Sequence, residues 1–300
     1  MPRRVCVIVN PSAGGGRAER GLPAVESALL DLDVSFHTER TRDIEHAVEL
    51  ARAAAAAGEV AAAMGGDGLI GAVAGALRGT EGVLGILPGG RGNDFGRVLG
   101  IPRELPAACR VLAEGTERQV DLGEVDGRLF IGIASTGLDS DANRIANEAP
   151  PWLGGLVYAY GALRALAAWT PARFDLELDG EHKTFTGYSV AAANSKAYGG
   201  GMYLAPDAEL DDGMLDVVVV EAYAKRRAVA RMPKLFKGTH VKDPEVHVFR
   251  AKEVRIAADR AFEVYADGDE IGTLPATVRA VPGALRVLVP DDAGGSGAGS

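Results

Sequence analysis

The first 120 residues alternate short apolar runs with longer segments of helical periodicity. Short apolar runs that end at glycine, proline or asparagine are typical of buried strands. The pattern predicts strands at 5–10, 34–39, 60–64 and 83–88, and helices at 23–32, 44–57, 69–77 and 105–113. Strands that alternate with helices in this way indicate a parallel sheet covered by helices. We therefore expect a Rossmann-like α/β domain in this part of the chain.

After Asp121 the pattern changes to strand-like runs separated by turn signals. Short strands at such spacing predict an antiparallel sandwich or barrel. The runs are 128–135, 174–180, 185–194, 215–222, 245–258, 261–269 and 284–290, and helical segments interrupt them at 152–170 and 224–238. The sequence thus predicts a β-rich second domain. The glycine- and serine-rich residues 291–300 are expected to be a disordered tail.

Composition and charge exclude several classes of protein. The 300 residues are 47% hydrophobic and 24% charged, as in ordinary globular proteins, and the formal net charge of −9 argues against a general nucleic-acid binder. Cys6 and Cys109 cannot form a disulfide framework, which favours the cytoplasm. The N-terminal apolar stretch is too short for a signal peptide. The segment 152–169 contains Arg164 and three glycines, so a buried or surface helix is favoured over a membrane span.

Glycine-rich loops follow three of the predicted strands. Their sequences are "NPSAGGG" (10–16), "GGDG" (65–68) and "PGGRGND" (88–94). Glycine lets backbone N–H groups approach an anion, and the carboxyl ends of parallel strands lie at one edge of the sheet. Each loop alone could be a tight strand-to-helix connection, but three together predict a phosphate site. Neither GxxxxGK[ST] nor GxGxxG is present.

Asp67 stands inside the second of these loops. A carboxylate beside bound phosphates would repel them unless a cation lay between, so Asp67 predicts Mg²⁺ if a nucleotide binds. The alternative is that Asp67 caps a helix N-terminus, a position that aspartate fills well.

The order and spacing of several blocks resemble the soluble bacterial diacylglycerol kinase family, which has sphingosine and ceramide kinases as more distant relatives. The blocks are "VNPSAGGG", "GGDG", "LPGGRGNDFGRVLGIP", "VDLGEV", "NSKAYGGGMYLAPDAELDDGMLDV" and "ADGDEIG...PGALRVLVP". The resemblance implies an ATP-dependent lipid kinase with an ATP-binding domain at 1–122, which a strand at about 284–290 rejoins, and a lipid-substrate domain at 123–283. It also implies that the nucleotide binds between the two domains.

Motif by motif, the resemblance also implies a set of nucleotide-binding residues. Asp67 would act through the magnesium ion of the nucleotide and take part in catalysis. The nucleotide-binding set is Asn10, Pro11, Ser12, Ala13, Gly14, Thr41, Gly65, Gly66, Asp67, Gly68, Arg91, Asn93, Asp94 and Asp121.

The block "AELDDGML" resembles the structural magnesium loop of the family. The resemblance implies three ligands, namely the Asp212 carboxylate and the main-chain carbonyls of Glu209 and Met214. An Asp-Asp-Gly turn offers clustered oxygens, which suit a hard cation. The alternative is a hairpin turn, which Asp-Gly signals equally well.

The block "ADGDEIG" resembles the Asp-Gly-Glu block of the family, whose last acid takes the proton from the acceptor hydroxyl. That position is Asp269, and Asp267 is the second candidate for this catalytic role. Both could instead be exposed residues of a β-turn.

This chain departs from the family pattern at four positions. The family has a threonine after GGDG, then Asn-Glu two places on, and a threonine in the third loop. Here the corresponding residues are Leu69, Gly71, Ala72 and Arg91. A hydroxyl and a carboxylate are lost, while an arginine can add a phosphate contact.

The expected partner is a lipid substrate at a membrane surface, with ATP as co-substrate and Mg²⁺ as cofactor. The segment 224–238 mixes basic and apolar residues as surface-bound helices do, although a solvated basic face is the alternative. The segment 152–169 could line an acyl-chain pocket or belong to the core. We expect a cytoplasmic protein, peripheral at the inner membrane surface, that does not bind nucleic acid and is compatible with a homodimer. Two other functions stay open: an NAD kinase-like enzyme and a non-catalytic nucleotide- or lipid-binding regulator.

Overall fold

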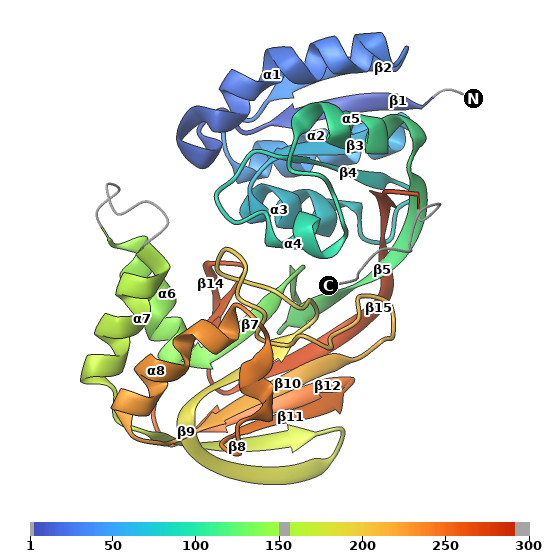
Figure 1. Ribbon diagram of the computed structural model, residues 1–300. Coiled ribbons are helices and arrows are strands. Elements are labelled where there is room, and N and C mark those ends of the chain that lie inside the picture. The colour runs from blue at the N-terminus through green and yellow to red at the C-terminus, as the bar shows by residue number, and fades with distance from the viewer. Residues whose placement is uncertain (1–2, 150–156, 292–300) are drawn as a thin grey trace. The chain divides into compact units, whose positions relative to one another are not determined.

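The computed structural model describes residues 3–149 and 157–291. The chain divides into two compact units (Figure 1), of which unit 1 comprises Met1–Val120 and Ala284–Ser300, and unit 2 comprises Asp121–Gly283. The chain passes from one unit to the other within two long strands, β5 (Thr116–Val125) and β15 (Ala276–Val289).

Unit 1 is built on a parallel sheet with the order β15-β4-β3-β1-β2. The strands that this unit contributes by itself are β1 (Arg4–Val9), β2 (Ser35–Arg40), β3 (Val60–Gly65) and β4 (Val83–Pro88). Arg286 and Val287 of β15 pair in parallel with β4, so the end of the chain completes this sheet. All six residues of β3 are buried, as expected for a strand covered on both faces. The predicted parallel α/β fold is confirmed.

Five helices accompany this sheet. They are α1 (Ala13–Asp31), α2 (Ile44–Ala56), α3 (Asp67–Leu77), α4 (Asp94–Val98) and α5 (Leu105–Glu114). Helix α1 packs against α5, and α2 packs against α3 (Figure 1). Helix α2 shows why the sequence folds this way: Asp43 caps its first turn by accepting from the His46 N–H, and Ala47, Ala51 and Ala54 form its buried stripe.

Two details of unit 1 differ from the sequence-based expectation. The helix expected at 23–32 starts earlier: α1 is bounded at Ala13, but Gly14, Gly15 and Gly16 have left-handed, non-helical backbone (φ +60° to +80°) and make a kink, so the regular helix follows Gly16. Short helix α4 was not predicted, since five residues are too few to show a periodicity.

Unit 2 is an antiparallel sheet, as predicted. Its path runs β14-β13-β7-β9-β8-β12-β15, with β10 pairing with β9 and β11 with β10. The bounds are β6 (Arg128–Phe130), β7 (Ile133–Gly137), β8 (Ala172–Leu178), β9 (Glu181–Ala193), β10 (Leu215–Glu221), β11 (Val246–Ala251), β12 (Glu253–Ala258), β13 (Glu263–Ala266) and β14 (Asp269–Thr273). Strand β9 changes partners midway, pairing first with β8 and then with β7 and β10. Gly187 lies at the change, where a Cβ would stand 2.3 Å from the Val220 carbonyl oxygen.

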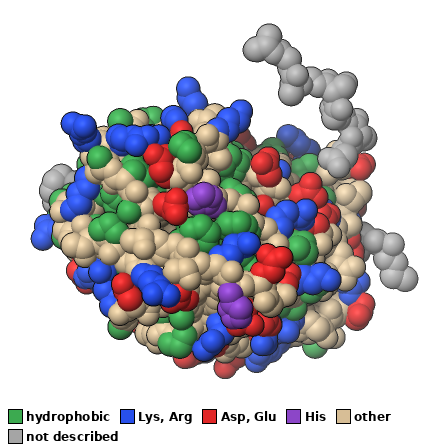
Figure 2. Space-filling view, turned by 90° about the horizontal axis from the view of Figure 1, so that it is seen from below, with side chains coloured by type: hydrophobic (Ala, Val, Ile, Leu, Met, Phe, Trp, Pro, Cys, Tyr) green, Lys and Arg blue, Asp and Glu red, His purple; other side chains and the backbone are tan. Residues whose placement is uncertain are grey.

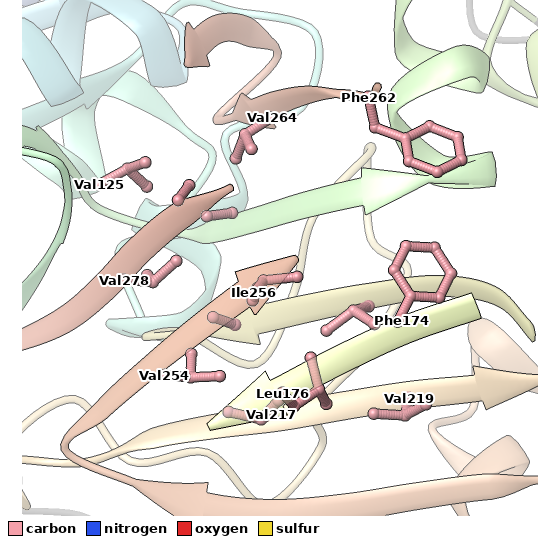
Figure 3. Close-up of a cluster of buried hydrophobic side chains, with 14 of the residues drawn as sticks. Val125, Phe174, Leu176, Val217, Val219, Val254, Ile256, Phe262, Val264 and Val278 are labelled. Atoms are coloured by element: carbon pink, nitrogen blue, oxygen red, sulfur yellow. The ribbon is translucent and has the colours of Figure 1, made fainter. Parts of the chain in front are cut away.

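Because β9 changes partners, strands of unit 2 lie opposite one another. The hydrophobic core of the unit lies between them. Figure 3 shows side chains from β5, β8, β10, β12, β13 and β15 directed into one interior. The rings of Phe174 and Phe262 stack there with centroids 5.7 Å apart, and Trp169 stacks on Phe262. This apolar interior is the main stabilising element of the unit.

The helices of unit 2 are α6 (Leu138–Asn147), α7 (Val157–Ala168), α8 (Lys225–Leu235) and the short 3₁₀ helix η2 (Thr239–Lys242). The segments predicted at 152–170 and 224–238 are helical as α7 and α8, although 150–156 and the tail 292–300 lie outside the described residues. Within the part of the chain that the structure describes, no helix is long and apolar enough to span a membrane.

Other expectations for unit 2 need correction. The run 245–258 is two strands rather than one, because the carboxylate of Asp179 accepts the N–H groups of Lys252 and Glu253 and fixes a turn there. The run 128–135 is likewise split into β6 and β7. Strands β5 and β14 and helix α6 were not predicted. The residue that breaks the long run is more than 70 positions away, so no local pattern could indicate the break.

A pH-dependent stability is expected from Asp139, in the first turn of α6. Burial raises its pKa from 3.8 to about 6, although the Ser189 hydroxyl donates to it and opposes the shift; Tyr198 also lies near this carboxyl. The folded protein therefore binds a proton more tightly than the unfolded chain, and stability falls as pH rises from about 4 to about 6. We expect Asp139→Asn to raise the free energy of unfolding at neutral pH by at most ~3 kcal/mol. The gain should vanish near pH 4 in urea titrations, and an equal gain at both pH values would contradict this origin.

Candidate functional site

The three glycine loops of unit 1 meet at the carboxyl edge of its sheet. The Asn10 N–H donates to the Met64 carbonyl at 3.1 Å, and the Gly89 N–H donates to the Gly65 carbonyl at 2.8 Å. The Arg17 guanidinium, on α1, donates to the Gly90 carbonyl at 2.9 Å. These bonds join the first loop to the second and third, so the convergence expected from parallel strands is present.

The loops approach so closely that side chains would not fit at two positions. A Cβ on Gly14 would lie 2.4 Å from the Gly89 carbonyl oxygen, and Gly14 also has a left-handed φ of +60°. A Cβ on Gly90 would lie 2.3 Å from the Cα of Gly66. The glycines are therefore required by backbone packing, and they leave a surface made largely of peptide groups.

The first loop is held in shape by its own polar side chains. The Asn10 amide oxygen accepts from both the N–H and the hydroxyl of Ser12, and the Ala13 N–H donates to the Asn10 carbonyl. Thr41, at the end of β2, donates its N–H to the Val9 carbonyl. Asn10, Ser12, Ala13 and Thr41 thus lie at one edge of the sheet, although their role toward a nucleotide stays a prediction.

Asp67 lies in the first turn of α3, with Gly66 as the N-cap of that helix. Its carboxylate caps a different helix: Oδ1 accepts from the Phe95 N–H of α4 at 3.1 Å. Burial and the neighbouring Asp94 raise the Asp67 pKa, and backbone N–H groups of Asn93, Asp94 and Phe95 oppose the rise. The alternative that Asp67 is the N-cap of a helix is therefore wrong for α3, whose N-cap is Gly66, while the Asp67 side chain accepts from an N–H of the first turn of α4.

The Asn-Asp pair of the third loop is buried. Asn93 has a left-handed φ of +52°, and its side chain both accepts from the Gly90 N–H and donates to the Gly90 carbonyl. Asp94 forms an ion pair with Arg97, which also donates to the Gly92 carbonyl at 3.0 Å. Arg91 is exposed. Arg17 and Arg97 escaped the sequence analysis, since a single arginine beside a glycine run carries no distinctive signal.

Two carboxylates face each other across Gly92. A Cβ on Gly92 would lie 2.9 Å from Asp67 Oδ2 and 3.1 Å from Asp94 Oδ2. Two half-buried or buried acidic groups held this close repel one another, and this repulsion adds to the effect of burial in raising the Asp67 pKa. Arg97 pairs with Asp94 Oδ1, and the two Oδ2 atoms stand on either side of Gly92; these oxygens suit Mg²⁺, although among the described residues no group of three His, Cys, Asp or Glu side chains could hold a metal ion.

Leu69, one of the departures from the family pattern, is 3% exposed and folds back over the end of β3. Its side chain fills the space beside Gly65, where a Cβ would stand 2.8 Å from Leu69 Cδ2. Leu69 therefore packs in the core beneath the loop, and Gly71 and Ala72 follow it on the same helix.

Asp121 lies at the start of unit 2 and is 2% exposed. One carboxylate oxygen accepts from the Gly213 N–H and the other from the Gly283 N–H, both at 2.7 Å. The Asp121 N–H donates to the Leu210 carbonyl. Asp121 lies on β5, so these bonds connect β5 with β15 and with the loop 209–214. A direct role of Asp121 in nucleotide binding stays a prediction.

The stability of this junction yields a test. Asp121→Ala leaves the Gly213 and Gly283 N–H groups unpaired in the interior, so we expect it to lower the free energy of unfolding by about 3 kcal/mol or more. Asp121→Asn keeps one acceptor oxygen and should cost about half as much. Urea denaturation measures the free energy of unfolding of both variants. Equal stability of the wild type and the alanine variant would contradict a stabilising role of the hydrogen bonds to Asp121.

The loop 209–214 collects acidic side chains around one arginine. Asp212 accepts from the Met214 N–H at 2.9 Å and forms an ion pair with Arg250. Burial raises the pKa of Asp216 to about 6, Arg250 opposes the rise, and Asp212, Asp207 and Glu209 add to it. The negative charge suits a cation, but among the described residues no group of three His, Cys, Asp or Glu side chains has metal-binding geometry. The ligand set of Glu209, Asp212 and Met214 stays a prediction.

The two acids of the "DGD" turn have different surroundings in unit 2. Both oxygens of Asp267 accept backbone N–H groups, from Ile131 at 2.7 Å and Gly132 at 2.9 Å. Asp269 is exposed at the start of β14. Asp267 therefore anchors the turn to the β6–β7 connection, and the Asp269 carboxylate is the more accessible candidate base.

Two family models cover nearly the whole chain. The model described as "Diacylglycerol kinase catalytic domain" matches residues 4–125, and the model described as "YegS C-terminal NAD kinase beta sandwich-like domain" matches residues 132–289. Their division falls near the boundary between units 1 and 2.

Curated relatives and solved structures agree with these matches. A diacylglycerol kinase of Mycobacterium tuberculosis is 34% identical over 295 residues, which cover 96% of this chain and 95% of the relative. A diacylglycerol kinase of Bacillus subtilis is 30% identical, with 97% of each chain covered. The crystal structure of a diacylglycerol kinase from Bacillus anthracis has the same fold, with a TM-score of 0.77, 21% identity, and coverage of 97% of this chain and 98% of that one. The chain belongs to the bacterial diacylglycerol kinase family and is a phosphotransferase with an alcohol group as acceptor.

Proposed function

We propose that the protein transfers the γ-phosphoryl group of ATP, in the presence of Mg²⁺, to the hydroxyl of diacylglycerol or a related lipid alcohol. The observation that carries the proposal is the meeting of three glycine loops beside the paired carboxylates of Asp67 and Asp94. Peptide N–H groups bind phosphate oxygens, and a cation at the carboxylates offsets the charge of both.

The loops of unit 1 are proposed to bind and orient the nucleotide. Residues 10–14, 65–68 and 89–94 would line the phosphates. The N–H groups of Asn10, Ser12, Ala13, Gly89 and Gly90 already donate within the protein, so other groups of the loops would contact the phosphates, and the exposed Arg91 guanidinium is a candidate. Asp67 and Asp94 would hold the magnesium ion, which neutralises charge on the transferring group. Because Asp67 caps α4, its carboxylate is fixed in place before the nucleotide arrives.

Asp269 is proposed to act as the general base. The proton of the acceptor hydroxyl would move to its carboxylate as the oxygen attacks phosphorus. Asp267 would position this base, because its two backbone hydrogen bonds fix the turn that precedes β14. The acids around the loop 209–214 support a second, structural cation held by Asp212 and the carbonyls of Glu209 and Met214.

A lipid acceptor is favoured over NAD by the extent of the similarity. The curated relatives named diacylglycerol kinase match this chain over more than nine-tenths of its length, through both units. Glycine loops with GGDG also occur in NAD kinases, so the first unit alone does not separate the two acceptors. The family membership also speaks against a purely regulatory protein.

The proposal is tested by incubating the purified protein with radiolabelled ATP and diacylglycerol in mixed micelles. We expect label in the lipid with Mg²⁺ present and none after chelation with EDTA, with activity restored by added Mg²⁺. Transfer that proceeds unchanged in EDTA would contradict the role of the metal. No label in any of a panel of lipid alcohols would contradict the lipid acceptor.

A further inference from the structure

Helix α8 and the residues after it form a basic segment in an acidic protein. Residues 225–245 hold seven Lys and Arg and two acidic residues, while the whole chain carries a net charge of −9. Figure 2 shows Lys and Arg side chains standing among acidic and apolar ones on the face seen from below, so the surface is not uniformly acidic. The positive charge of this segment is therefore a local feature.

One side of α8 is fixed to unit 2 by paired charges. Arg231 forms ion pairs with Asp243 and Glu245, Arg227 with Glu245, and Lys234 with Asp243. The Arg231 guanidinium also lies over the Tyr223 ring, 5.0 Å from its centroid. These contacts settle the orientation of the helix and neutralise the basic residues on its inner side.

The opposite side carries apolar and basic residues together. We call Arg226, Val229, Phe236 and Lys237 the α8 outer face. Val229 is 45% and Phe236 57% exposed, and Arg226 and Lys237 are exposed as well. Among the described residues, no carboxylate forms an ion pair with Arg226 or Lys237. At 100° per residue, Arg226 and Val229 fall on one side of the helix, away from Arg227, Arg231 and Lys234, and the exposed Phe236 and Lys237 stand in the turn that follows Leu235.

We propose that the α8 outer face docks on an anionic lipid surface. This inference rests on the proposed lipid substrate, which must be met at a bilayer. Exposed apolar side chains flanked by unpaired cations match the boundary between acyl chains and anionic headgroups. The inner ion pairs hold the helix so that the free cations, rather than the paired ones, point outward.

The test is sedimentation with phosphatidylglycerol-containing vesicles and with phosphatidylcholine vesicles. We expect the wild type to bind the anionic vesicles, and to bind them more weakly, but still measurably, when salt shortens the range of electrostatic attraction. Arg226→Glu/Lys237→Glu should weaken binding at least about tenfold, and Phe236→Ser should weaken it at low and high salt alike. The matched control, Arg52→Glu/Arg110→Glu, makes the same charge change at exposed positions of α2 and α5. Equal loss in the control, or equal binding to both kinds of vesicle, would overturn the proposal.

Kinase assays separate this proposal from the proposed function. With short-chain diacylglycerol dispersed in water, Arg226→Glu/Lys237→Glu should retain wild-type activity, whereas with substrate in anionic vesicles its activity should fall with binding. Full activity on vesicles would overturn the docking surface and leave the kinase function standing. Binding of the anionic vesicles without phosphorylation of any lipid alcohol would contradict the kinase function and leave the docking surface standing. Loss of activity on the dispersed substrate as well would also contradict the docking role.

Discussion

Asp67→Asn is expected to lower kcat at least about 100-fold while leaving the fold intact, because losing one charged group that stabilises a transferring phosphoryl costs this much. The asparagine amide oxygen can still accept from the Phe95 N–H, so the cap on α4 is kept. Burial, and after it the neighbouring Asp94, raise the Asp67 pKa, and the substitution removes both the buried charge and its repulsion with Asp94. The melting temperature should therefore be equal to or higher than that of the wild type.

The comparison with Asp67→Ala separates the two roles of this side chain. The alanine variant loses the charge and the cap, so it should match the asparagine variant in activity but fall below it in stability by about 1 kcal/mol. Steady-state kinetics at several Mg²⁺ concentrations and thermal unfolding measure the two effects. An asparagine variant with near wild-type kcat would remove the magnesium role and leave Asp67 as a cap alone.

Asp269→Asn is expected to lower kcat by about 10²- to 10⁴-fold, the range in which general bases contribute. Asp269 is exposed, so the melting temperature should stay unchanged. ATP binding, measured by equilibrium titration, should also be kept, because the base acts on the acceptor hydroxyl.

Two neighbouring variants serve as controls for this prediction. Glu270→Gln, the next residue along β14, should be nearly as active as the wild type. Asp267→Asn retains only one carbonyl oxygen for the two N–H groups of Ile131 and Gly132, so it should lose stability as well as activity. If Asp269→Asn is active and Asp267→Asn is inactive with an unchanged melting temperature, the two acids exchange roles.

Hydrophobic periodicity predicted the helices and strands whose formation depends on residues within the same segment. Strands β1, β3 and β4 are apolar runs that end at asparagine, glycine and proline, and α2 has its cap and its alanine stripe within the segment itself. The predicted strand boundaries were wrong where a residue distant in the sequence determines where a strand ends. The break between β11 and β12 depends on Asp179, and the long course of β15 follows from pairing with β12 and then β4.

In the candidate site, too, features set by local sequence were predicted and features set by distant contacts were not. Glycine loops after parallel strands were enough to predict that the loops meet, because strand direction alone brings them together. The sequence did not show that Asp67 caps α4, that Asp121 accepts from Gly213 and from Gly283 of β15, or that Arg250 pairs with Asp212. Each of these contacts joins residues at least 28 positions apart, and each depends on packing that composition does not encode.

The most direct test of the account offers both acceptors at once. The protein is incubated with Mg²⁺, γ-labelled ATP, diacylglycerol in mixed micelles and NAD in the aqueous phase, and the label in the organic extract is compared with the label in the dinucleotide. For the wild type, the account predicts label in the extracted lipid and none in NAD. For Asp269→Asn, it predicts that the lipid label is lost as well. Label in NAD with an unlabelled lipid fraction would contradict it.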